Sequence, residues 1–180
     1  MPVEKMNEML GLYKAYMEIR DDIFFEHVLF SYQWWILLFI IVGLWILWGV
    51  IVDKNRIVSI LLVGLLTSII AIVLDDIGLN LMLWDYPYWI TPFTSRMDPV
   101  NIAIIPVSYM LVYQYMRTWK AYAIMLVMAS LFATFIAEPI FIKLNMYLIL
   151  QWKYWYSLPF YIAIGISAKW FVDKLKRNSA

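Results

Sequence analysis

The sequence predicts an all-α protein: an integral membrane bundle of five transmembrane helices with an N-terminal amphipathic helix. Two observations predict this class. The 180 residues are 64% hydrophobic with a mean hydropathy of +0.75, whereas soluble domains are about 45–50% apolar. Five apolar stretches also approach the ~20 residues that cross a bilayer. No repeat or low-complexity tract separates them, so we expect a single membrane domain over 1–180.

Composition also argues against several kinds of partner and site. A net charge of +1 gives no reason to expect a nucleic-acid partner. The absence of cysteine excludes thiol chemistry, disulfides and cysteine-based metal sites, and a single histidine, His27, excludes a multi-histidine site. We therefore predict neither a metal nor a cofactor. The first apolar run comes after about thirty mostly polar residues without a cleavage pattern, so no removable signal peptide is expected.

The N-terminal segment, 1–32, has apolar residues at helical spacing, including Met6, Met9, Leu10, Tyr13 and Met17. Charged residues lie between them, which predicts an amphipathic helix on the membrane surface or on the bundle. Three basic residues stand against six acidic ones, so attraction to anionic lipid is not its obvious purpose.

Five predicted spans come after this segment. Asp98 is a natural N-cap and Pro99 suits the first helical position, so the third span has the clearest start. Tryptophan and tyrosine gather near the span ends, as in an aromatic belt. The spans cover about 34–52, 57–77, 99–116, 121–142 and 156–172.

Lysine and arginine near the span ends predict the orientation. An odd number of spans puts the termini on opposite sides, and basic residues close to span ends favour the cytoplasm. Eight basic residues fall on the C-terminal side: Lys54, Arg56, Arg117, Lys120, Lys169, Lys174, Lys176 and Arg177. Six fall on the other: Lys5, Lys14, Arg20, Arg96, Lys143 and Lys153. We therefore expect a multi-pass protein of the cell membrane with its C-terminus in the cytoplasm and its N-terminus outside.

Two spans carry a face of small and polar residues that ends in a carboxylate. In the second span this face comprises Gly64, Ser68, Ala71, Asp75 and Gly78, which lie at offsets of three and four residues. Asp75 should point into the bundle, whereas the next residue along the chain lies about 100° around the helix.

In the fourth span, two adjacent stripes recur every four residues. One is Ala129, Ala133 and Ala137; the other is Ser130, Thr134 and Glu138. Small faces let helices approach closely in lipid, so these stripes predict helix packing. Asp75 and Glu138 lie ~27 and ~25 Å along their spans at the helical rise. We therefore expect both carboxylates at one depth, around a shared outer-side pocket.

Other polar and aromatic residues converge on this level. The candidate pocket comprises Asp75, Asp76, Glu138, Asn101, Trp84, Asp85, Tyr86, Trp152 and Lys153. Two neighbouring ionised carboxylates repel, so a nearby cation or a proton is expected, and Lys143, Lys153 and Arg96 are the candidate cations. The same residues also suit a structural role near the interface, where carboxylates cost less than at the bilayer centre.

Several short motifs resemble an uncharacterised family of small multi-spanning membrane proteins of spore-forming Gram-positive bacteria. The motifs are Trp84-Asp85-Tyr86, Pro106 with Tyr109, Tyr113-Gln114, Glu138-Pro139, and Trp152-Lys153 with Tyr156-Ser157. The similarity extends from the first span to the fifth. That family has no assigned activity, so the resemblance implies location and architecture only. Membrane-bound lycopene cyclases are also small and carboxylate-dependent, but their Pro-x-Glu-Glu/Asp motif is absent.

Three functions remain open at this point. The pocket could bind or sense a small cationic or amphipathic ligand, or a proton, with Trp84, Tyr86 and Trp152 as apolar and cation–π walls. The chain could be an enzyme acting on a lipid or isoprenoid with Glu138 as general acid or base. It could be an accessory subunit whose alanine-rich face docks a partner helix. Transport is weaker, because no inverted repeat is present. Expected partners are the lipid bilayer, a small ligand or lipid, and a helix-packing protein.

Overall fold

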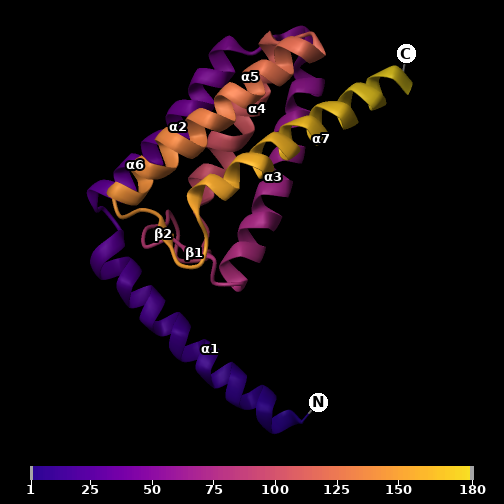
Figure 1. Cartoon of the computed structure of the whole chain (residues 1–180). Coiled ribbons are helices and arrows are strands. Elements are labelled where there is room, and N and C mark those ends of the chain that lie inside the picture. Colours follow the sequence, from indigo (N-terminus) through magenta and orange to yellow (C-terminus); the bar gives the residue numbers. More distant parts are fainter. Residues whose placement is uncertain (1, 179–180) are drawn as a thin grey trace.

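The computed structural model describes residues 2–178 and is almost wholly helical (Figure 1). The α-helices are α1 (Val3–Ile23), α2 (Tyr32–Ile51), α3 (Ile57–Asn80), α4 (Ile105–Tyr115), α5 (Trp119–Phe132), α6 (Glu138–Lys143) and α7 (Ser157–Asn178). Three π-helical segments, η1 (Phe24–Val28), η3 (Val100–Ile104) and η4 (Ala133–Ala137), and two 3₁₀ turns, η2 (Lys54–Arg56) and η5 (Tyr154–Tyr156), join them. The strands β1 (Trp84–Asp85) and β2 (Leu148–Ile149) pair antiparallel.

The prediction of an all-helical chain is confirmed. Three helices are long and apolar enough to cross a membrane: Tyr32–Ile51, Lys54–Asn80 and Trp119–Lys143. The last of these is the continuous series α5, η4 and α6. The predicted third span corresponds to η3 and α4, a shorter apolar helix over Val100–Tyr115. The fifth corresponds to α7, whose C-terminal half carries several charges.

Five helical units alternate in direction within the described chain: α2, α3, η3–α4, α5–η4–α6 and α7 (Figure 1). We call the end that holds β1, β2 and the connections 81–98 and 144–156 the loop end. At the other end the connections are short, with η2 between α2 and α3 and residues 116–118 between α4 and α5. The C-terminal part of α7 extends away from the loop end, whereas α1 projects beyond it.

Helix α1 confirms the predicted N-terminal helix and stands apart from the bundle (Figure 1). Most of its side chains are exposed, but Arg20 is only 7% exposed. The Arg20 guanidinium donates to the carbonyl of Pro92 and to Ser95 Oγ at 3.4 Å. These bonds fix the C-terminal part of α1 to the loop end. That α1 lies on a membrane surface stays a prediction.

The half of the bundle away from the loop end is tightly packed because glycines allow close approach. Met110 of α4 packs directly on Gly64 of α3, where a Cβ would leave no room. Gly165 of α7 is covered in the same way by Tyr109 and Leu126. Helix α7 is therefore in close contact with both α4 and α5.

A buried lysine adds a second attachment of α7. Lys169 is 3% exposed, and its Nζ lies 3.0 Å from Asp173 Oδ2. The same ammonium group lies 4.8–5.1 Å from the ring centroids of Tyr113, Trp119 and Tyr122. Aromatic faces attract cations, so this cage balances the cost of burying the charge.

Candidate functional site

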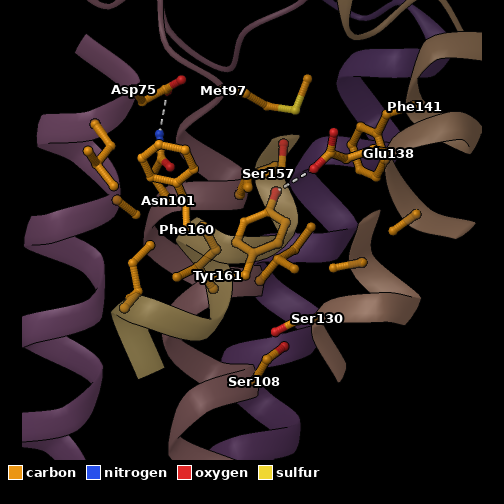
Figure 2. A pocket seen from close by; sticks show the side chains of 18 of the residues that line it. Asp75, Met97, Asn101, Ser108, Ser130, Glu138, Phe141, Ser157, Phe160 and Tyr161 are labelled. Atoms are coloured by element: carbon orange, nitrogen blue, oxygen red, sulfur yellow. Dashed lines mark hydrogen bonds between the residues drawn. The ribbon is translucent and has the colours of Figure 1, made fainter. Parts of the chain in front are cut away.

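A cavity of about 420 Å³ lies in the half of the bundle nearest the loop end (Figure 2). Its walls come from α3, η3–α4, α5–η4–α6 and the start of α7, and aromatic residues of the loop end complete it. Most lining side chains are apolar. The polar or hydroxylated lining residues are Asp75, Trp84, Tyr86, Asn101, Ser108, Tyr109, Ser130, Glu138, Tyr147, Trp152, Ser157 and Tyr161. The volume falls within the range of small-molecule sites.

Asp75 and Glu138 both line this cavity, so they share one pocket as the sequence suggested. Figure 2 shows Asp75 on one wall and Glu138 on the opposite wall. Asp75 lies on the predicted small face of α3, where Gly64, Ala71 and Gly78 are also buried. The residue spacing therefore predicts the buried face of α3 correctly.

Both oxygens of the Asp75 carboxylate accept hydrogen bonds, and the residue is only 6% exposed. Its Oδ1 accepts from Trp84 Nε1 at 2.9 Å and from Tyr86 Oη at 2.7 Å. Its Oδ2 accepts from Asn101 Nδ2 at 2.6 Å. Three neutral donors converge on one acceptor group, an arrangement that suits a carboxylate, which accepts but does not donate.

Each donor to Asp75 is itself held in place. Trp84 packs directly on Gly78, where a side chain would collide with the indole ring. Burial raises the pKa of Tyr86 well above its usual range, and the nearby Asp75 charge raises it further. The Tyr86 hydroxyl therefore stays protonated and remains a donor. Asn101 is 4% exposed.

Glu138 differs sharply from Asp75 in its surroundings. Its Oε1 accepts from Tyr161 Oη at 2.8 Å, as Figure 2 shows. Its Oε2 is buried and has no hydrogen-bond partner among the described residues. Ser157 lies one helical turn before Tyr161, beside the carboxyl group, and its Oγ accepts from Trp152 Nε1 at 3.2 Å. One carboxyl oxygen of the cavity thus has no partner at hydrogen-bond distance among the described residues, and the Ser157 hydroxyl is the donor nearest to the carboxyl group.

Two π-helical segments form opposite parts of the wall, and each precedes a proline. Pro106 has no N–H, so the carbonyl four residues earlier, that of Ile102, loses its helical donor. Trp45 Nε1 donates to that oxygen at 3.0 Å, and Ser68 Oγ donates to the carbonyl of Asn101 at 2.8 Å. Side chains of α2 and α3 therefore satisfy the freed backbone oxygens of η3. Such π-helical turns are frequent at functional sites.

Aromatic side chains close the cavity at the loop end. Trp84 and Trp152 meet edge to face with centroids 5.2 Å apart, and Tyr86 stacks on Tyr147 at 5.6 Å. The carbonyl of Leu83 accepts from the backbone N–H groups of residues 150, 151 and 152, which holds the two connections together. Stacking and strand pairing thus give this cover a fixed geometry.

Three of the predicted pocket residues lie elsewhere. The carboxylate of Asp76 accepts from Arg96 at 2.9 Å on the outside of α3. Asp85 is exposed and accepts from the backbone N–H of Tyr86 at 2.7 Å. The Lys153 ammonium lies over the Trp155 ring at 5.7 Å, outside the cavity. Asn101, Trp84, Tyr86 and Trp152 do line the cavity with the two carboxylates.

The expected cations are not where the sequence placed them. Within residues 2–178, no ion pair joins Asp75 or Glu138 to Arg96, Lys143 or Lys153. Arg96 is engaged by Asp76 and by Asp98 at 3.5 Å. Asp98 therefore does not act as the N-cap of η3; its other oxygen accepts from Thr94 Oγ1 at 2.6 Å.

The small stripes of the fourth span also have a different role from the expected one. Ala129, Ala133 and Ala137 all line the cavity, as do Ser130 and Glu138. Their short side chains leave space between α5–η4–α6 and α3. Small residues usually allow close approach, which is why the stripes predict helix packing, but here the small faces surround a void.

Sequence reasoning missed Tyr161, Tyr147 and Met97 as pocket residues. Tyr161 lies four residues after Ser157, so the shared helical face with Ser157 could have identified it. Tyr147 and Met97 lie in irregular connections, which carry no periodic signal. Comparison of the chain with protein-family models, curated proteins and solved structures gives no match.

Proposed function

We propose that this chain is a multi-pass cell-membrane protein that binds a small amphipathic ligand with a cationic or N–H-donating head group. The ligand occupies the cavity between α3 and α5–η4–α6. The observation that carries the proposal is the asymmetry of the two carboxylates: both oxygens of Asp75 accept hydrogen bonds, whereas Glu138 Oε2 has no partner at hydrogen-bond distance among the described residues.

The membrane part of the proposal has five spans: the three long apolar helices, together with η3–α4 and α7. The alternating helix directions support an odd number of crossings (Figure 1). The basic residues near η2 and the end of α7 favour a cytoplasmic location for that end. The loop end and the N-terminus then lie outside.

The charge and polarity of the cavity walls indicate which kind of ligand the cavity binds. Two carboxylates face one apolar cavity, and neither has an ion-pair partner in the described chain. A buried anion without a partner is costly, so a positive charge or a proton at this level stabilises the site. Apolar walls favour an apolar tail on the same molecule. A cationic amphiphile satisfies both requirements.

The other two functions have less support. An acid–base enzyme needs a second titratable group within reach of the substrate, but the carboxylate of Asp75 is occupied by three donors. An accessory subunit was suggested by the alanine-rich face, and that face lines the cavity instead of an outer surface.

Photolabelling in lipid nanodiscs tests the proposal. The probe is a dodecylamine with a diazirine in its chain, and dodecanol with the same diazirine is the uncharged comparison. We expect the amine to label cavity peptides, and Glu138→Gln to weaken the labelling by about tenfold, equivalent to about 1.4 kcal/mol of affinity. Asp76→Asn is the matched control because its carboxylate lies outside the cavity, and it should leave labelling unchanged.

Two results would contradict the proposal. The first is equal labelling of cavity peptides by the amine and the alcohol. The second is amine labelling that survives Glu138→Gln at the level of the unaltered protein, because the head group would then not be recognised by Glu138.

A further inference from the structure

We infer that the occupant is a membrane-borne amphiphile that reaches the cavity sideways from the bilayer and not from the water at either end. This inference rests on the proposed function, because it concerns the source and shape of the same ligand. Three observations support it: both ends of the cavity are closed, its side wall reaches the apolar surface, and its polar groups lie at two depths.

The loop end offers no open route. Trp84, Tyr86, Tyr147 and Trp152 line the cavity from that side and pack on one another in two ring pairs. Tyr147 is 8% exposed. Strand pairing between β1 and β2 and the three backbone bonds to Leu83 join the connections that carry these rings. A molecule coming from water would have to separate them.

The opposite end is closed by the tightly packed half of the bundle. Tyr109 Oη donates to the carbonyl of Tyr161 at 2.7 Å, and Tyr122 Oη donates to that of Gly165 at 2.8 Å. These bonds join α4 and α5 to α7 below the cavity. The side chain of Leu126 is fully buried against Gly165, so close packing between α5 and α7 closes the cavity there.

The side wall, in contrast, includes residues of the outer surface. Ile77 of α3, Phe132 of α5 and Phe160 of α7 line the cavity and are 50%, 59% and 45% exposed. All three are apolar, as expected for positions that face lipid. Side chains that belong to both the cavity and the apolar surface mark the boundary through which an amphiphile moves between them.

The polar groups of the cavity lie at two levels. Asp75 and Glu138 lie at the loop end, and Ser108 and Ser130 lie together at the far end (Figure 2). Glu138 and Ser130 are eight residues apart, which is ~12 Å along a helix. Between them the wall is apolar and small, with Ala133 at its middle. The cavity thus fits an elongated molecule with its head at the carboxylates and its apolar chain parallel to the helices.

A reducible disulfide across the loop end tests the route by which the ligand enters the cavity. Asp85 and Leu148 are cross-strand partners of β1 and β2, and neither lines the cavity. Directly opposed strand residues lie within the range that a disulfide bridges. The chain has no other cysteine, so an Asp85→Cys/Leu148→Cys variant forms one defined bond. Each single cysteine variant is the matched control.

The measurement is the rate at which the diazirine dodecylamine, preloaded into nanodiscs, occupies the cavity before the labelling flash. We expect the oxidised and reduced forms of the double variant to label cavity peptides at rates within about twofold of each other. A rate that falls about tenfold or more on oxidation and recovers with reductant would overturn the inference. Absence of cavity labelling in the reduced form would instead contradict the proposed function.

Discussion

Replacement of Asp75 tests whether its carboxylate organises the site. Asp75→Ala removes the acceptor of three donors, those of Trp84, Tyr86 and Asn101. A buried donor without a partner costs about 1–3 kcal/mol. Because the adjoining cavity lets side chains shift, we expect a total loss of about 3–6 kcal/mol in the free energy of unfolding.

Asp75→Asn isolates one of these bonds. The amide oxygen can still accept from Trp84 and Tyr86, but the amide nitrogen then faces the donor nitrogen of Asn101, whose own side-chain amide must rotate by 180° to accept. One conflict should cost about 1–2 kcal/mol. Exchange of the two groups, Asp75→Asn with Asn101→Asp, restores a donor–acceptor pair and should recover most of the loss.

The assay is reversible unfolding of purified protein in mixed micelles, followed by far-UV circular dichroism. Asp76→Ala is the matched control, because this carboxylate is adjacent in the chain but forms a half-exposed ion pair with Arg96. Such pairs are worth about 0.2–1 kcal/mol. If Asp75→Ala and Asp76→Ala destabilise the protein equally, or if the exchange gives no recovery, the reasoning about Asp75 fails.

Two further changes test the cavity and the packed half. Ala133→Leu should fill the middle of the cavity and abolish probe labelling with a small change in stability. The control Ala163→Leu, on an exposed face of α7, should leave labelling intact. If both variants label like the unaltered protein, the probe does not occupy this cavity. Lys169→Met should lower the free energy of unfolding by about 1–3 kcal/mol. This is less than the loss of a fully buried ion pair, because Asp173 is 32% exposed and can be hydrated. Lys174→Met is the exposed control, and an equal effect of the two substitutions would refute the stabilising role of the aromatic cage.

The sequence predicted the helices and one buried face well because both depend on local periodicity. The predicted second span, 57–77, differs from α3 only at its C-terminal end. Asp75 and Asp76 were assigned different directions by the 100° step of the helix, and the structure places them inside and outside the bundle. The distance of each carboxylate along its predicted span also indicated that Asp75 and Glu138 lie at the same depth.

The partners of these groups could not be predicted in the same way. Arg96 lies in an irregular connection, and its position beside Asp76 depends on how residues 81–98 fold over the loop end. The void between small faces was also missed, since alanine spacing indicates only that a neighbour could approach closely. Whether it does depends on η3 and η4, whose wider turns are not visible in hydrophobic periodicity.

These π-helical segments have a consequence for the evolution of the chain. A π turn accommodates one extra residue locally, so the helix beyond each segment keeps the rotational phase that it would have in an α-helix one residue shorter. Deleting one residue from Val100–Ile104 or Ala133–Ala137 can therefore restore α geometry without turning the downstream part. The same deletion in a regular α-helix would rotate everything beyond it by about 100°. Conversion of the second segment to α geometry at constant length would instead turn Glu138 away from the cavity without changing any side chain. Helix length is therefore constrained most strongly in the regular helices of the bundle, and single-residue deletions should be tolerated better in η3, η4 and the exposed α1 than in α3 or α7.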